Sequence, residues 1–311
     1  MTYVLIVRSE EEPWLNEVRG AEYLVANIPH FSLAEQLVLP WRLKRTHINL
    51  LFSPHFNVPI LTRIPFVVTI HDLILHHFPN AASPLKRAAY RFLMGRAVRR
   101  AKRIIAVSKF TASEISAMYG ASAASRTTVI GEGVDVLFSP QNDMQKNAVL
   151  EKYGIPSPFF LYVGNAKEHK NVQMLIDAHA ALPPSAPHLV LVTSGQEASR
   201  LRHSDRVMRL ESVNDTDLPA LYSAAEAFVT ASLYEGFCLP ILEARACGCP
   251  VIAPRSTAIP EIADEGCVLI DPTIEGLRRA LSTPLPSRSI GIPRRWEDVA
   301  TQVQTVLVNA V

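Results

Sequence analysis

The segment that decides the fold is residues 227–253, AFVTASLYEGFCLPILEARACGCPVIA. It begins with a short apolar run, Ala227–Thr230, and continues with a helix-length periodic stretch, Pro240–Cys247. Gly248 then suits the end of that helix, and Val251–Ala253 forms a second apolar run. A strand, a helix and a second strand in this order predict a βαβ unit, whose two strands lie parallel.

The same alternation of short apolar runs and helical periodicity recurs along the chain, which predicts an α/β protein with doubly wound parallel sheets. Further strands are expected at Tyr3–Val7, Ile48–Phe52, Phe66–Ile70, Arg103–Val107, Thr127–Ile130, Phe159–Val163, His188–Thr193 and Cys267–Ile270. Further helices are expected at Leu85–Arg100, Ala112–Tyr119, Val172–Leu182 and Leu218–Ala224.

The length of 311 residues exceeds the usual size of a single hydrophobic core, so two domains are expected. A polar stretch between Ser139 and Pro158 separates two series of strands and helices. We therefore predict one Rossmann-like domain over 1–139, a linker over 140–158 and a second Rossmann-like domain over 159–295. Residues 296–311 are expected to form a C-terminal helix that packs back on the first domain.

Charge and hydropathy exclude several classes of protein. The formal net charge is +2, with 31 Lys and Arg against 29 Asp and Glu, which gives no reason to expect a nucleic-acid partner. No apolar run approaches the ~20 residues that a membrane span requires, and the N-terminus lacks a charged-then-apolar signal segment. We therefore expect a cytoplasmic protein.

A cluster of cations lies on the predicted helix near residues 86–103, and two interpretations of it stay open. It is either a solvated basic face or a peripheral contact with anionic lipid at the inner face of a membrane. The cluster consists of Lys86, Arg87, Arg91, Arg96, Arg99, Arg100, Lys102 and Arg103.

Four cysteines lie close together in the sequence, but they do not predict a metal site. Cys238, Cys247, Cys249 and Cys267 lack the paired Cys-x2-Cys spacing of zinc ligands. Three of them lie in apolar or Gly/Pro surroundings, where a free thiol packs as a small hydrophobic group. No metal is expected.

Polar residues that directly follow strands are the first candidates for a site, since open α/β sheets bind ligands beyond the carboxyl ends of their strands. Backbone N–H groups at the start of the predicted helix would favour a diphosphate, through unpaired donors and the helix dipole. Glu235 lies beside that anion site, where a carboxylate is useful only as an acceptor for sugar hydroxyls. Glu243, further along the same predicted helix, reaches a ribose by the same logic.

The pattern Glu-Gly-Phe-x-Leu-Pro with Glu-x7-Glu, followed by Cys-Gly-x-Pro-Val-Ile and Pro260-Glu261, resembles glycosyltransferase family four, the retaining GT-B transferases. Tyr162-Val163-Gly164 with Lys170-Asn171 is similar to the family's loop whose lysine neutralises the donor diphosphate. Thr69–Asp72 is similar to the strand end whose histidine lies near the donor sugar, and Val129–Asp135 is similar to the interdomain segment.

The resemblance implies a GT-B fold and a division of roles in the site. It implies that Lys170, Glu235 and His71 are catalytic. The residues expected to bind the donor are Gly164, Asn165, Gly236, Phe237, Cys238, Leu239 and Glu243. For Glu261, a ligand contact and a carboxylate at a helix start remain equal alternatives.

Two departures from the family accompany the resemblance. The family carries an arginine directly after the loop glycine, whereas this chain has Asn165, so a second cation would have to come from Lys167 or His169. The family also has a strand, a glycine-rich loop and a helix before the strand at Tyr3–Val7. We therefore expect a first domain shortened by about one βα unit, which is roughly 30 residues.

The resemblance implies transfer of a sugar from a nucleoside-diphosphate sugar, with GDP-mannose as the preferred donor, to a glycan or lipid-linked acceptor in surface polysaccharide synthesis. It implies retention of configuration and no cofactor or essential metal. The alternative is a non-catalytic or weakly active sugar-nucleotide-binding homologue that acts as a partner subunit. An NAD-dependent oxidoreductase is disfavoured, because Gly131-x-Gly133 lacks the third glycine of the dinucleotide fingerprint.

Overall fold

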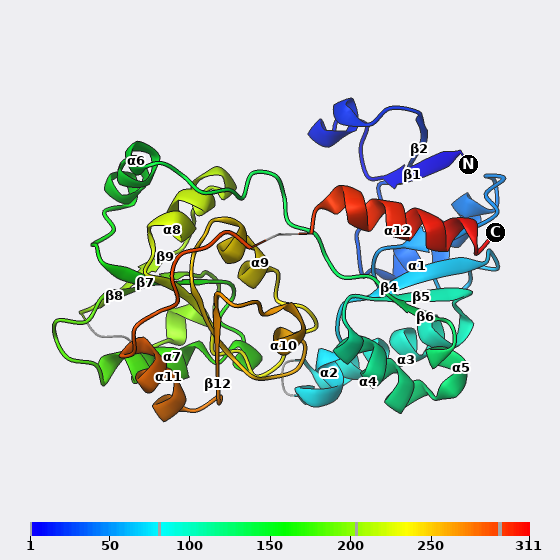
Figure 1. Ribbon diagram of the computed structural model, residues 1–311. Coiled ribbons are helices and arrows are strands. Elements are labelled where there is room, and N and C mark those ends of the chain that lie inside the picture. Colours follow the sequence, from blue (N-terminus) through cyan, green and yellow to red (C-terminus); the bar gives the residue numbers. More distant parts are fainter. Residues whose placement is uncertain (1, 80–81, 203–204, 292–293) are drawn as a thin grey trace.

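The computed structural model describes residues 2–79, 82–202, 205–291 and 294–311, and two α/β halves lie side by side in it (Figure 1). Each half is built around a parallel sheet, as the alternation of strands and helices predicts. The predicted α/β architecture with two Rossmann-like domains is therefore confirmed.

In the C-terminal half the strands have the order β12-β11-β10-β7-β8-β9. From β7 the chain moves outward to β9, returns to β10 beside β7, and then moves outward to β12 on the other side, which is a doubly wound sheet. The strands are β7 (Phe159–Val163), β8 (His188–Val192), β9 (Val207–Leu210), β10 (Ala227–Val229), β11 (Val251–Pro254) and β12 (Cys267–Ile270). The strand order reverses between β7 and β10, so a ligand site is expected beyond the ends of these two strands.

Helices cover both faces of this sheet, because its strands are apolar on both sides. One core contains residues of α8 (Leu218–Ala224) and α9 (Leu239–Ala246), and the other contains residues of α7 (Val172–Ala180) and α11 (Ile274–Leu281). The short helix α10 (Ile259–Ile262) follows β11.

The N-terminal half has a sheet of order β3-β4-β5-β6. These strands are β3 (Leu51–Ser53), β4 (Phe66–Ile70), β5 (Arg103–Ala106) and β6 (Thr127–Val129). A main core on this sheet includes residues of α1 (Leu33–Leu43), α3 (Pro84–Arg100) and α4 (Lys109–Tyr119). The short helices α2 (Ile74–His77) and α5 (Ala121–Ala124) lie before α3 and after α4.

The helix α12 (Trp296–Val308) lies on the N-terminal half, although it follows the C-terminal half in sequence (Figure 1). Val299, Val306 and Leu307 of α12 share a core with Val67 of β4 and Ile105 of β5. The last helix of the chain is thus part of the first domain's core.

The strands β1 (Tyr3–Val7) and β2 (Ala21–Val25) pair with each other in parallel. In the part of the chain that the structure describes, they form a sheet of their own and share no ladder with β3–β6. Figure 1 shows this pair beside α12, on the same half as both chain ends.

The stretch 140–158, expected as a linker, contains a regular helix, α6 (Asp143–Tyr153). Asn142 and Gln145 form a reciprocal capping box at its start, and Gly154 ends it in the left-handed conformation at φ 63°. Leu150 and Tyr153 pack against the core that contains α8 and α9. The segment therefore belongs structurally to the C-terminal half.

Candidate donor site

The switch point between β7 and β10 brings the two central site residues together. Lys170 follows β7 through a short loop and a turn of 3-10 helix, and Glu235 follows β10. The Lys170 Nζ lies 2.6 Å from Oε1 and 2.8 Å from Oε2 of Glu235. Two residues that the sequence separates by 65 positions thus form a bidentate ion pair where a doubly wound sheet binds its ligand.

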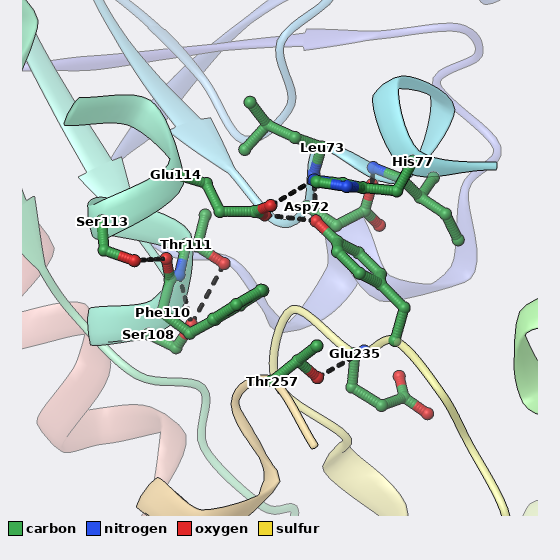
Figure 2. Close-up of polar contacts among 12 residues, drawn as sticks. Asp72, Leu73, His77, Ser108, Phe110, Thr111, Ser113, Glu114, Glu235 and Thr257 are labelled. Carbon is green, nitrogen blue, oxygen red and sulfur yellow. Dashed lines mark hydrogen bonds and ion pairs between the residues drawn. The ribbon is translucent and has the colours of Figure 1, made fainter. Parts of the chain in front are cut away.

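The ion pair keeps the lysine charged. Burial alone would lower the pKa of Lys170, but the Glu235 carboxylate outweighs this and raises that pKa above its ordinary value. Glu235 is 8% exposed, and its backbone N–H donates to the Thr257 hydroxyl at 2.9 Å (Figure 2). The site therefore holds a positive group and a negative group in fixed positions.

The loop that opens α9 has the conformation expected of an anion-binding helix start. Cys238, the residue before the helix, is left-handed at φ 82°, and its carbonyl accepts from the Ile241 N–H at 3.1 Å. Among the hydrogen bonds of the described residues, none uses the backbone N–H of Gly236, Phe237, Cys238 or Leu239 as a donor. These donors, next to the Lys170–Glu235 pair, suit a diphosphate.

Glu243 lies on α9 in a mostly buried position. Its Oε2 accepts a hydrogen bond of 2.8 Å from the hydroxyl of Tyr222 on α8. Burial raises the pKa of Glu243, and the Tyr222 hydrogen bond opposes this without cancelling it. Tyr222, which the sequence did not suggest as a site residue, thus orients the carboxylate expected to bind ribose.

Asn165 lies in the loop after β7 and takes part in the hydrogen bonds of that loop. Gly164 has φ 150°, and a Cβ atom there would lie 3.0 Å from the Tyr162 hydroxyl oxygen. That hydroxyl donates to the Asn165 carbonyl at 2.7 Å, and Asn165 Oδ1 accepts from the Lys167 N–H at 3.2 Å. The Asn165 side chain therefore stabilises the conformation of the loop in which it lies.

His169 is not a suitable second cation, contrary to one of the two alternatives expected from the sequence. It is 7% exposed, and burial lowers its pKa to about 4, so the imidazole is neutral near neutral pH. Its ring packs 5.8 Å from that of Phe78 in the N-terminal half. Lys167 is exposed.

His71 directly follows β4, and its backbone contacts the loop 234–238 before α9, which we call the donor loop. A Cβ atom on Gly236 would lie 1.8 Å from the His71 carbonyl oxygen, so only glycine fits there. The His71 ring faces the N-terminal half: Nδ1 lies 2.9 Å from Glu132 Oε1, and Nε2 lies 2.9 Å from the Pro54 carbonyl oxygen. The Glu132 hydrogen bond raises the pKa of His71.

Glu132 is a site residue that the sequence reasoning missed. It lies in the Val129–Asp135 segment, which drew attention only as an interdomain motif. Its position between two glycines directly after β6 was the available signal, because the carboxyl ends of neighbouring parallel strands lie at one edge of a sheet.

A cavity of about 700 Å³ lies in the N-terminal half and not at the Lys170–Glu235 pair. Its walls are mainly apolar and come from the sheet and from α12, including Phe52, Ile105 and Val303. His71 and Glu132 also line it. Since the His71 backbone touches the donor loop, the cavity adjoins the candidate site.

Cys238, Cys247 and Cys249 are buried, and Cys267 is partly buried. Within the described ranges, no group of three or more His, Cys, Asp or Glu side chains has a geometry that could hold a metal ion. Among the same residues, no helix is both long enough and apolar enough to serve as a membrane span.

Two family models together match most of the chain. Residues 4–137 match glycosyltransferase family 4, and residues 145–296 match glycosyl transferases group 1. O-antigen chain mannosyltransferase B of Escherichia coli is 30% identical over 276 residues, which are 84% of this chain and 70% of that protein.

Two further relatives are mannosyltransferases by name. O-antigen chain mannosyltransferase RfbU of Salmonella typhimurium is 26% identical over 73% of this chain and 62% of its own length. The MMP alpha-(1->4)-mannosyltransferase of Mycolicibacterium hassiacum is 28% identical over 79% of this chain and 66% of its own length. The chain thus spans between 62% and 70% of these three relatives.

Solved structures of the GT-B type share the fold. Sucrose-phosphate synthase from Thermosynechococcus elongatus superposes with a TM-score of 0.76 at 20% identity, covering 99% of this chain and 88% of that one. Anabaena Alr3699/HepE in complex with UDP and glucose also gives a TM-score of 0.76 at 20% identity, over 98% of this chain and 91% of that one.

Proposed function

The chain belongs to glycosyltransferase family 4, and from this premise we propose that it transfers a sugar from a nucleoside-diphosphate sugar to a glycan or lipid-linked acceptor in surface polysaccharide synthesis. The observation that carries the proposal is the Lys170–Glu235 ion pair at the switch point of the C-terminal sheet. The N–H donors of Gly236–Leu239 lie next to it on the same loop as Glu235.

The proposed donor is GDP-mannose. Support comes from the names of the relatives, which describe mannosyltransferases. In the proposed complex the diphosphate lies at the start of α9 beside Lys170, Glu235 accepts from sugar hydroxyls, and Glu243 accepts from the ribose. Gly164 and Asn165 border the diphosphate from the loop after β7.

The proposed reaction is substitution at the anomeric carbon with retention of configuration. The acceptor hydroxyl oxygen forms the new bond to that carbon, while the bond from the carbon to the phosphate oxygen breaks. The nucleoside diphosphate leaves with the bonding electron pair, and its phosphate oxygen takes the acceptor proton. Lys170 and the α9 amides stabilise the charge that develops on the leaving phosphate, without a metal or other cofactor in the proposed scheme.

The acceptor is proposed to approach from the N-terminal half. His71 and Glu132 line the cavity described above, and the His71 backbone contacts the donor loop. A hydroxyl that enters between these residues and Glu235 would reach the donor sugar. Mainly apolar walls with a polar end suit an amphipathic acceptor.

Peripheral membrane contact is proposed through α3. Leu85 and Phe92 are 81% and 62% exposed on this helix, and Lys86, Arg91 and Arg99 are exposed on it as well. Tyr90 and Met94 lie on the buried face of α3. Exposed apolar and basic side chains on one helix favour binding to the surface of an anionic membrane. The proposed location is therefore the cytoplasm, at the inner face of the membrane.

A ligand screen followed by a release assay tests the function. GDP-mannose is expected to raise the melting temperature more than UDP- or ADP-sugars do, because a ligand that binds only the folded state stabilises it by mass action. Release of GDP should then depend on an added glycan or lipid-linked acceptor. If nucleotide sugars bind but no acceptor stimulates release, the alternative of a non-catalytic binding subunit replaces the proposal. The observation that favours this alternative is Asn165, which stands where the family carries an arginine and whose side chain hydrogen-bonds within its own loop.

Sedimentation with vesicles tests the membrane contact separately. The protein should sediment with vesicles that contain anionic lipid and stay in solution with purely zwitterionic ones. Phe92→Ser should weaken the association, whereas Met144→Ser, an exposed apolar residue on α6, serves as the control. Equal loss in both variants would contradict a contact through α3.

A further inference from the structure

The helix α4 of the N-terminal half meets the C-terminal half through one of its faces. Both oxygens of the Glu261 carboxylate, from α10, accept backbone hydrogen bonds from its first turn: Lys109 N–H at 2.8 Å and Phe110 N–H at 2.6 Å. The buried Thr111 hydroxyl lies 3.4 Å from the Gly236 carbonyl oxygen. One helix turn further on, the Glu114 carboxylate accepts from the hydroxyl of Tyr234.

These contacts hold the residues on both sides of Glu235, the carboxylate of the candidate donor site. Tyr234 and Gly236, both held by α4, are the residues immediately before and after Glu235. The close approach of Gly236 to the His71 carbonyl leaves this loop no room to move toward the N-terminal half. The position of Glu235 therefore depends on how α4 is docked.

The contact between Glu114 and Tyr234 is buried, and both Glu114 oxygens and the Tyr234 hydroxyl have hydrogen-bond partners. Glu114 is 8% exposed and Tyr234 is 4% exposed. The second Glu114 oxygen contacts the ring of His77, and Figure 2 shows the carboxyl group pointing from α4 toward that ring. The Tyr234 hydroxyl also accepts from the Leu73 N–H at 3.0 Å, and burial raises the pKa of Tyr234, so the phenol remains a donor.

We propose that α4 is a positioning element for the donor site, in which Glu114, through Tyr234, and Glu261, through the first turn of α4, hold Glu235 in its working position when the two halves are closed. The proposal rests on the proposed function. None of the three residues touches the reacting atoms. They act through the loop that carries Glu235.

A buried hydrogen bond to a charged group suits this role. Such a bond contributes little net stability, because both groups lose water, but it strongly disfavours any geometry in which one of them stays buried without its partner. The Glu114–Tyr234 contact therefore specifies the closed arrangement of the two halves more than it stabilises either half. Ordinary packing across the interface would not require the two polar groups to meet.

Tyr234→Phe with a matched control tests the proposal. Tyr153→Phe also removes a hydroxyl that donates to a carboxylate, here Asp217 at 2.7 Å, but both partners lie in the C-terminal half. With donor and acceptor saturating, Tyr234→Phe should lower turnover about tenfold or more, as expected for loss of a hydrogen bond to a charged group. The affinity for the free nucleoside diphosphate should stay unchanged, and Tyr153→Phe should change neither.

Parallel losses of affinity and turnover in Tyr234→Phe would overturn the proposal, since they would mean that the donor loop itself is damaged. Unchanged turnover in a folded Tyr234→Phe variant would overturn it as well. Glu114→Gln should lower turnover in the same direction, and the double variant should be no worse than the more affected single variant, because both remove one interaction. Additive losses would show that the two residues act independently.

Glu261→Gln provides a variant with little risk to folding, because Glu261 is exposed. It replaces two carboxylate acceptors by one amide oxygen, so the amides of Lys109 and Phe110 should exchange with deuterium faster than in the wild type. Tyr234→Phe should have the same effect, and Tyr153→Phe should not. This measurement needs no substrate, so it separates failure of the α4 proposal from failure of the proposed function: exchange that is equal in all three variants overturns the former only.

Discussion

Lys170 and Glu235 hold each other in a bidentate ion pair, so removing the lysine has two effects. Lys170→Ala should lower turnover on the order of 100-fold, because the leaving phosphate loses a charge-assisted contact. The variant should also lose some stability, since Glu235 would stay largely buried without its partner. Turnover and the melting temperature measured on the same preparation separate the two effects.

The matched control is Lys152→Ala, which removes an ion pair of 2.6 Å between Lys152 and Asp217. This Lys152 side chain is half exposed, and its pair lies outside the site, so little change in turnover or stability is expected. Near-wild-type turnover in a well-folded Lys170→Ala variant would remove Lys170 from the catalytic residues.

Glu243 gives a prediction with a pH dependence. Burial raises the pKa of this carboxyl, so it takes up its proton at a higher pH than an ordinary glutamate. A protonated carboxyl is a weaker acceptor for ribose hydroxyls, and nucleotide affinity should therefore decline as the pH falls from neutral toward this raised pKa. Glu243→Gln should bind more weakly at neutral pH and should lack this decline.

Calorimetry with the free nucleoside diphosphate, at neutral and mildly acidic pH, checks the Glu243 prediction. Glu275→Gln alters an exposed carboxylate that pairs with its own helix neighbour, Arg278, and should keep the wild-type profile. Unchanged affinity in Glu243→Gln at neutral pH would place Glu243 outside the nucleotide site.

The start of the helix α9 depends on Cys238, which precedes the helix in the left-handed conformation. The left-handed conformation already strains the Cβ of cysteine, and a second branch on Cβ increases this strain. Cys238→Val should therefore cost more stability than Cys247→Val, in which a buried cysteine at the other end of α9 has φ −87°. Nucleotide affinity should fall only in Cys238→Val, since the first amides of α9 would be displaced.

Urea unfolding and nucleotide binding of the two valine variants provide the measurements. Equal losses of stability would mean that the added methyl groups, and not the backbone of Cys238, decide the outcome. A stable Cys238→Val variant with normal nucleotide affinity would contradict the assignment of the α9 amides to the diphosphate.

The elements that the sequence predicted well are those with a clear local pattern. Phe159–Val163 and Leu218–Ala224 are matched to the residue by β7 and α8, because apolar periodicity and flanking breakers coincide there. α1 escaped prediction, because Gln36 and Pro40 lie on its buried side while Leu33 and Trp41 are exposed, the reverse of an ordinary amphipathic pattern.

Part of the candidate site was predictable because it also follows clear local sequence patterns. Lys170, Glu235 and the start of α9 each follow a recognisable strand, and the rule for open sheets places them at one edge. The contacts that cross between the halves were not predictable. Glu114 and Tyr234 are 120 residues apart, and no local pattern reveals which side chains meet when two domains close.

At the scale of the whole molecule, the N-terminal half leaves one side of its sheet incompletely covered. Parallel sheets are normally buried on both faces. Here α12 contributes Val299, Val306 and Leu307 to the core, but the cavity of about 700 Å³ remains between the sheet, α12 and Tyr3 of β1. The apolar walls of this cavity are accessible surface that an added side chain could cover.

We therefore predict that Ala300→Leu, on the wall that α12 contributes, stabilises the protein by about 0.5–2 kcal/mol, as cavity-filling substitutions commonly do. It should also reduce the fluorescence of a hydrophobic dye, because the new side chain occupies the space that the dye would enter. Gln302→Leu adds a leucine to an exposed position of the same helix that does not line the cavity, and should neither stabilise the protein nor reduce the fluorescence. Destabilisation by Ala300→Leu would mean that the cavity is closed in solution, since a side chain forced into filled space costs stability.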